Sequence, residues 1–355
     1  MLPEDNVNKV LAIAEHIAKF SGNLKEVLVP SNIFQQFKDS SSKNLLYLNT
    51  DNFQLTTKRN AILSIIDFSE DLIHEETTTL TFEDLKKQTP YQDEPLTTLN
   101  LANAALEEGG ELTVVCTEPY NMSIARKYLL CAKFTDIQLN SNTILAKKRK
   151  FAKYSFDGGK ITLEETTSPE LIRSIHNFAK ELFKKYNFDI TVDDIFTPYS
   201  DFFVCYKTDT KEIITFLRHT WHLPHHYLPC MLATKVNDGL HIVLEKPDEN
   251  YYSEIFSPFI NSLSAVKAYK ELVRNFLQHF LSVGIKNVFT TFESSDQKTG
   301  DFYKRVFGFE DTEIVLKYGD FGGEWGLLKG GWNSFPKIKN NFLSSITLDV
   351  SSPKS

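Results

Sequence analysis

The segment SAVKAYKELVRNFLQHFLSVGIKNVFTTF (residues 264–292), followed by KTGDFYKRVFGF (residues 298–309), decides the fold predicted for the C-terminal half of the chain. Apolar side chains recur at helical spacing from Val266 to Phe280, and Gly284 follows as a stop signal. The segment therefore predicts a long amphipathic helix that packs against a sheet.

Strands are predicted on both sides of this helix. Residues 253–259 precede it and residues 287–292 follow it, and both are short apolar runs with strand propensity. A short helix from Lys298 and a closing strand over residues 312–316 come next. This order predicts a mixed sheet with flanking helices.

Further elements are expected upstream in the same half. Ser168 is a good helix cap with Pro169 at the first helical position, and Asp209 lies in the turn of a predicted hairpin. Glycines 322–323 and 330–331 are expected to mark tight turns. Strands are expected at residues 160–165, 202–206, 213–218 and 239–244.

The first 150 residues alternate short apolar runs with helical patterns, which predicts an α/β unit. Its first helix begins after Asn6, and a later helix over residues 99–108 is expected to stop at Gly109-Gly110 before a buried strand. Strands are expected at residues 27–29, 45–48, 61–66 and 112–115, with a closing antiparallel pair at 134–139 and 143–146.

The stretch LEEGGELTV (residues 106–114) and the later CAKFTDIQL (residues 131–139) resemble the second half of a class I methyltransferase-like Rossmann domain, similar in extent to the reduced domain of the anamorsin family. Such enzymes hold S-adenosylmethionine with a glycine-rich loop after the first strand. Here there is no glycine between Gly22 and Gly109. The resemblance therefore implies a domain without its cofactor, with a structural or partner-binding role.

Composition and charge limit the partners and the compartment. The net charge of −7 and the pI of about 5.8 argue against a broad nucleic-acid surface. There is no apolar run long enough to span a membrane, and the N-terminus lacks a signal-peptide pattern. Four widely spaced cysteines suit reduced thiols in a cytoplasmic protein. The expected domains are residues 1–150 and 151–335, followed by a tail at 336–355.

The motif FYKRVFGF, with the order of elements around it, resembles the second half of a GNAT acyltransferase fold. The resemblance implies an acyl-CoA or acetyl-CoA donor and a small-molecule amine or peptide acceptor. Residues 253–260 (SEIFSPFI) are also similar to a strand of the N-acyl amino acid synthase and acyl-homoserine lactone synthase branch, which implies acyl carrier protein as a possible donor and partner. Pro258 replaces the arginine of that branch.

The resemblance places the donor where two parallel strands separate, with the pyrophosphate at the N-terminus of the long helix. The loop over residues 260–265 has neither glycine nor arginine, unlike the usual GNAT loop. Its serines either bind a phosphate or only cap the helix. The expected donor-binding residues are Phe256, Ser257, Phe259, Ser262, Ser264 and Ala265.

Three residues are candidates for proton transfer. The GNAT resemblance implies that Tyr303 is the tyrosine that protonates the departing thiolate, and the alternative is an aromatic side chain that only fills the short helix. Glu254 is the candidate base for the acceptor amine, and Glu293 at the end of the next strand is the second. A surface strand glutamate is the alternative for each.

The sequence HTWHLPHH, residues 219–226, concentrates four histidines. His219, Trp221 and His222 are candidates for contact with the acceptor, and an ordinary loop is the alternative. No metal is expected here, because Pro224 prevents helical ligand spacing and because the cluster contains no cysteine or carboxylate.

Together these features predict an N-acyltransferase acting on a thioester donor and an amine acceptor, with a homodimer among the expected assemblies. The alternative is a non-catalytic binding or scaffold protein built from two degenerate enzyme folds.

Overall fold

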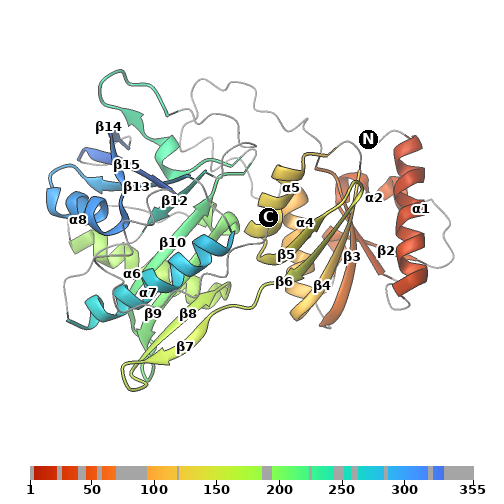
Figure 1. Ribbon diagram of the computed structural model, residues 1–355, viewed down its shortest axis with the longest axis horizontal. Helices are drawn as coiled ribbons and strands as arrows, with labels where there is room; N and C mark the ends of the chain where they lie inside the picture. Colours follow the sequence, from red (N-terminus) through yellow and green to blue (C-terminus); the bar gives the residue numbers. More distant parts are fainter. Residues whose placement is uncertain are drawn as a thin grey trace. The chain divides into compact units, whose positions relative to one another are not determined.

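The computed structural model describes residues 4–21, 26–38, 45–53, 58–68, 94–117, 120–185, 194–223, 226–242, 252–256, 263–283, 287–318 and 323–331. The chain divides into two compact units (Figure 1). The first comprises Met1–Thr78, Glu83–Lys150 and Leu223–His225, and the second Thr79–Phe82, Phe151–His222 and His226–Ser355. No helix in the described part of the chain is long and apolar enough to cross a membrane.

The first unit is a six-stranded sheet in the order β2-β1-β3-β4-β6-β5. Strands β2, β1, β3 and β4 are parallel, and β6 runs antiparallel to both of its neighbours. The elements are α1 (Glu4–Ser21), β1 (Glu26–Val29), α2 (Ser31–Lys38), β2 (Leu46–Asn49), β3 (Arg59–Ile66), α4 (Glu94–Ala105), β4 (Leu106–Cys116), α5 (Met122–Cys131), β5 (Phe134–Leu139) and β6 (Thr143–Lys148).

Helices flank this sheet, with α1 and α2 on one side and α4 and α5 on the other (Figure 1). Val10 of α1 and Phe37 of α2 pack with Val27, Leu63 and Ile65 of the sheet in one buried cluster. The arrangement confirms the mixed α/β character expected from the sequence. The more specific methyltransferase-like resemblance remains a prediction.

The predicted end of the helix before β4 is wrong. Helix α4 stops at Ala105, and Leu106 already pairs with Arg59 of β3. The pairing shifts before it resumes at Ala61 and Glu111, so the intervening residues bulge out of the strand. Gly109, at φ 72°, supplies the left-handed conformation that this bulge needs. Pairing with β3 therefore places in the strand residues 106–108, which local propensity assigns to the helix.

The second unit is a nine-stranded sheet in the order β11-β14-β15-β13-β12-β10-β9-β8-β7. Only β12 and β13 are paired in parallel among the strands described. The elements are β7 (Lys153–Phe156), β8 (Ile161–Thr166), α6 (Pro169–Lys185), η4 (Asp194–Tyr199), β9 (Ser200–Lys207), β10 (Ile213–Trp221), η5 (Pro229–Leu232), β11 (Thr234–Lys235), β12 (Tyr252–Phe256), α7 (Leu263–Val283), β13 (Asn287–Glu293), α8 (Gln297–Phe307), β14 (Glu310–Lys317) and β15 (Trp325–Gly331).

Helices α6 and α7 lie on opposite faces of this sheet. Ile175 of α6 packs with Phe202 and Phe216, whereas the ring of Phe276 on α7 lies 5.8 Å from that of Phe203. Because neighbouring residues of a strand point to opposite faces, the two helices sandwich β9 and β10. Helix α8 lies on the same side as α7, since the rings of Tyr269 and Phe302 are 6.0 Å apart.

Two local predictions in this unit are wrong. Gly330 lies inside β15 instead of in a turn, and a Cβ there would come within 2.0 Å of the Phe309 ring. This glycine therefore makes room for an aromatic side chain. The strand expected at residues 239–244 is limited, in its described part, to a single bridge between Thr234 and His241, and residues 243–244 lie outside the described chain.

Candidate active site

The central feature of the second unit is the place where β12 and β13 separate. Tyr252, Ser253 and Glu254 pair with Asn287, Val288 and Phe289, and no pairing between these strands is recorded beyond that point in the described residues. Strand β12 nevertheless stays paired with β10 as far as Phe256. Strand β13 stays paired with β15 as far as Glu293. The two strands therefore diverge while each remains bonded to its outer neighbour.

Helix α7 connects the two diverging strands, in the order β12, α7, β13. It begins at Leu263, and Ala265 in its first turn is 2% exposed. The N-terminus of a helix presents free N–H groups that favour an anion. Ser257, Phe259 and Ser262 lie outside the described residues, as do the side chains of Phe256 and Ser264. The donor-binding role of this set remains a prediction.

Tyr303 lies beside the point of divergence. Its hydroxyl hydrogen-bonds with Thr290, the residue that follows the last paired position of β13, and lies near the hydroxyl of Tyr269 on α7. The residue is 5% exposed. Burial raises the pKa of Tyr303 to about 12, and the nearby hydroxyls of Tyr269 and Thr290 oppose part of that rise. Tyr303 is therefore a neutral phenol at physiological pH, bonded to β13 and close to Tyr269 of α7.

The local sequence explains how Tyr303 reaches this place. Asp296 caps α8 by accepting hydrogen bonds from the backbone N–H of Thr299 (3.2 Å) and from its hydroxyl (2.6 Å). Gly308, at φ 64°, ends the helix in the left-handed conformation. The chain then turns into Phe309, whose ring lies 6.2 Å from that of Tyr303. Both ends of the short helix are thus specified.

The two candidate bases occupy different positions. Glu254 is the last residue of β12 that pairs with β13, opposite Phe289 and also opposite Thr220 of β10. Its side chain lies outside the described structure. Glu293 ends β13, where its carboxylate accepts a 2.7 Å hydrogen bond from the Ser295 hydroxyl. The backbone thus places position 254 at the divergence, whereas Glu293 has a partner in its own turn.

The histidine-rich segment is not a loop throughout. His219 and Trp221 belong to β10 and are fully buried, and His222 directly after it is 2% exposed. The ring of His226 lies 4.3 Å from that of Tyr199, and His225 lies outside the described residues. Contact of these residues with an acceptor remains a prediction.

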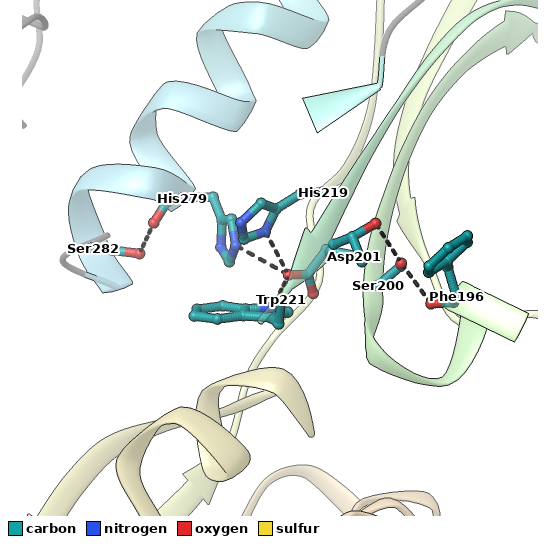
Figure 2. Close-up of polar contacts among 8 residues, drawn as sticks. Phe196, Ser200, Asp201, His219, Trp221, His279 and Ser282 are labelled. Atoms are coloured by element: carbon teal, nitrogen blue, oxygen red, sulfur yellow. Dashed lines mark hydrogen bonds and ion pairs between the residues drawn. The ribbon is translucent and has the colours of Figure 1, made fainter. Parts of the chain in front are cut away.

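A polar cluster that the sequence analysis missed surrounds His219 (Figure 2). Asp201 Oδ2 lies 3.1 Å from His219 Nδ1 and 3.5 Å from His279 Nε2, and it accepts a 2.7 Å hydrogen bond from Trp221 Nε1. These residues come from β9, β10 and α7. One signal was available, since Asp201 is the only acidic residue of β9, whose other charged residue, Lys207, ends the strand. Nothing local connected it to His279.

No protein-family model and no curated protein gives a significant match to this sequence. The chain is similar to solved structures that cover about half of it. One is FeeM, an N-acyl amino acid synthase from uncultured soil microbes, at 11% identity over 51% of this chain and 92% of that chain, with a TM-score of 0.34. Another is Arabidopsis thaliana NAA60 in complex with acetyl-CoA, at 11% identity over 49% and 99%, with a TM-score of 0.31. A third is a GNAT-family acetyltransferase from Streptococcus pneumoniae, at 10% identity over 48% and 99%, with a TM-score of 0.31.

Proposed function

We propose that the second unit is an acyltransferase that moves an acyl group from a thioester, an acyl-CoA or an acyl-carrier thioester, to an amine acceptor. The observation that carries this proposal is the divergence of β12 from β13 after the Glu254–Phe289 pair. Strands that separate in this way leave backbone N–H and C=O groups able to bond an extended ligand. The arm of the thioester donor contains amides that match such groups.

Tyr303 supplies the acid in this proposal. The amine attacks the thioester carbonyl carbon, the C–S bond breaks, and the departing thiolate takes the phenolic proton. Thr290, which holds the Tyr303 hydroxyl, directly follows the last paired residue of β13. The raised pKa keeps the phenol protonated at neutral pH, so that the proton is present when charge develops on sulfur.

The acceptor amine must lose a proton in the same reaction. We assign this step to Glu254 or, through water, to Glu293, and the register favours Glu254. Positions 254 and 289 are paired, whereas Thr290 is the next residue along β13. Because side chains alternate along a strand, positions 254 and 290 belong to opposite faces of the sheet by register. Donor and acceptor then meet between them.

The test is ligand-induced stabilisation followed by single-site kinetics. The full chain is heated with acetyl-CoA, long-chain acyl-CoA or S-adenosylmethionine. A ligand at 100 times its dissociation constant stabilises by about 2.7 kcal/mol, and we expect this shift with an acyl-CoA only. Stabilisation by none of the three would contradict the proposal.

Tyr303→Phe is then expected to lower kcat by roughly 10²- to 10⁴-fold with little change in donor affinity, because it removes the acidic hydroxyl and keeps the ring. Tyr206→Phe is the matched control. Tyr206 is also buried, and its hydroxyl donates a 2.6 Å hydrogen bond to Glu164, but it lies on the α6 face. Equal kcat in wild type and Tyr303→Phe would remove Tyr303 from the reaction.

A non-catalytic binding or scaffold protein is the second candidate, and one observation in the first unit favours it. In sheets of this type, ligands bind at the carboxyl ends of the strands where the strand order reverses, here between β1 and β3. Ser31, directly after this edge of β1, bonds Asn49 Oδ1 at 2.7 Å and Thr50 Oγ1 at 2.9 Å. Its polar groups are used within the protein, which suits a unit that has lost its cofactor.

A further inference from the structure

We propose that Asp201, His219 and His279 bind one divalent transition-metal ion of the zinc type, which fastens α7 to β9 and β10. The three candidate ligand atoms lie within 4.8 Å of one another. This proposal does not depend on acyl transfer, since none of these side chains is the acid or a candidate base of the proposed reaction.

The distances between the candidate ligand atoms fit a shared ion. A tetrahedral zinc ion with bonds of 2.0–2.1 Å keeps its ligand atoms about 3.3–3.4 Å apart. Asp201 Oδ2 lies 3.1 Å from His219 Nδ1 and 3.5 Å from His279 Nε2. The second distance is too long for a good N–H···O hydrogen bond but fits two ligands that share an ion. Only the separation of the two imidazole nitrogens, up to 4.8 Å, has to shorten.

Burial and residue type support the same assignment. The side chains of Asp201 and His219 are 0% exposed and that of His279 is 6% exposed. An ionised carboxylate withdrawn from water needs a compensating positive charge, and a divalent cation between one carboxylate and two imidazoles supplies it. Two histidines and one aspartate are the nitrogen and oxygen ligands that zinc accepts, leaving a fourth position for water.

Trp221 completes the arrangement from outside the ligand set. Its Nε1–H donates a 2.7 Å hydrogen bond to the same Asp201 oxygen (Figure 2). Ligating carboxylates are themselves commonly hydrogen-bonded, and loss of such a partner typically weakens metal binding by roughly 10- to 100-fold. Trp221 therefore orients the carboxylate in this proposal, and its effect on metal affinity separates an ion site from a hydrogen-bonded core.

The experiment measures metal binding to the full chain. Chelator-treated protein is titrated with Zn²⁺ and, separately, with Co²⁺, whose visible absorption reports tetrahedral geometry. We expect one ion per chain and a rise in melting temperature with Zn²⁺. His279→Asn is expected to weaken Zn²⁺ binding by more than about 100-fold, since it removes a ligand and not an outer partner, and Trp221→Phe by about 10- to 100-fold. His226→Asn, outside the cluster, is the matched control with unchanged binding.

A second variant keeps the test decisive if ligand removal prevents folding. His279→Cys retains a metal-binding atom at this position, and we expect the cobalt form to gain a thiolate-to-metal charge-transfer band. Failure of wild-type protein to bind either ion overturns the proposal. So does Zn²⁺ binding that His279→Asn and Trp221→Phe both leave unchanged, because the ion would then lie elsewhere.

Discussion

Tyr303 connects chemistry and stability at the scale of single residues. Its pKa is raised to about 12 by burial, whereas an unfolded tyrosine titrates near 10. As the pH rises above 10, Tyr303 loses its proton in the unfolded state before it does so in the folded state. The contribution of Tyr303 to the free energy of unfolding is therefore intact below pH 10 and falls between about pH 10 and 12. We expect the free energy of unfolding to fall by up to about 2–3 kcal/mol across that pH range because of this group.

This is measured by urea unfolding at pH 9 and at stepwise higher pH. Tyr303→Phe cannot ionise, so its loss of stability over the window should be smaller than that of wild type by about this amount. Parallel curves for the two proteins would show that the phenol is as easily ionised in the fold as in water.

Gly330 is a second residue with a specific physical role. A Cβ at this position would approach the Phe309 ring to 2.0 Å, and overpacking of this kind typically costs about 1–3 kcal/mol. Gly330→Ala should lower the free energy of unfolding accordingly. Adding Phe309→Leu, which removes the obstructing ring, should recover part of the loss relative to the sum of the two single changes. Strict additivity would contradict the contact.

Single residues also show which parts of the candidate sites could be predicted from the sequence. The position of Tyr303 in a short helix was predicted from the FYKRVFGF motif, because local signals fix both ends of that helix, and its role as an acid stays a prediction. Asp201 and His279 were not found, because they meet His219 only through strand pairing and helix packing. The prediction that no metal binds rested on the lack of a carboxylate in residues 219–226, and the fold brings one from β9.

At the scale of elements, α8 depends on its N-terminal cap. Asp296 accepts hydrogen bonds from both the backbone and the hydroxyl of Thr299. Asp296→Ala should destabilise the second unit by about 1 kcal/mol, as typical cap removals do. Asp301→Ala, an exposed change in the same helix, is the control with an effect within about 0.5 kcal/mol. Chemical denaturation of both variants measures this, and equal stabilities would argue against the cap.

Elements with a strong local period were predicted correctly. Helix α7, the hairpin of β9 and β10 and the closing pair β5–β6 all agree with their sequence patterns. The cap by Ser168 is also confirmed, since its hydroxyl accepts from the N–H of Leu171 at 3.4 Å. The start of β4 and the glycines of β15 were assigned wrongly, because partners distant in sequence decide them: β3 in one case and the Phe309 ring in the other.

At the scale of the whole molecule, all four cysteines are free and buried. Burial raises the thiol pKa of Cys116 and of Cys205, so little reactive thiolate exists at neutral pH. The native chain should therefore react slowly with a thiol reagent at every cysteine, and four equivalents should react at once in denaturant. Fast reaction of any native cysteine would show that its surroundings open readily.

The sequence predicted two α/β halves from alternating patterns, and the acidic balance of the chain argued against a nucleic-acid surface. The sequence did not predict the order of the strands in either sheet. The order β11-β14-β15-β13-β12-β10 interleaves segments separated by many residues, and propensity carries no information about which strands become neighbours.

One mechanical consequence follows from the way β12 leaves β13. Within the described sheet, only three residue pairs join one block of strands (β7, β8, β9, β10 and β12) to the other (β13, β15, β14 and β11). The two strands at this junction each stay paired with their outer neighbour, β12 with β10 and β13 with β15. Backbone pairing at this junction therefore ends partway along the two strands. An extended molecule bound there would pair with backbone groups of both strands, so we expect its binding to restrict relative motion of the two blocks.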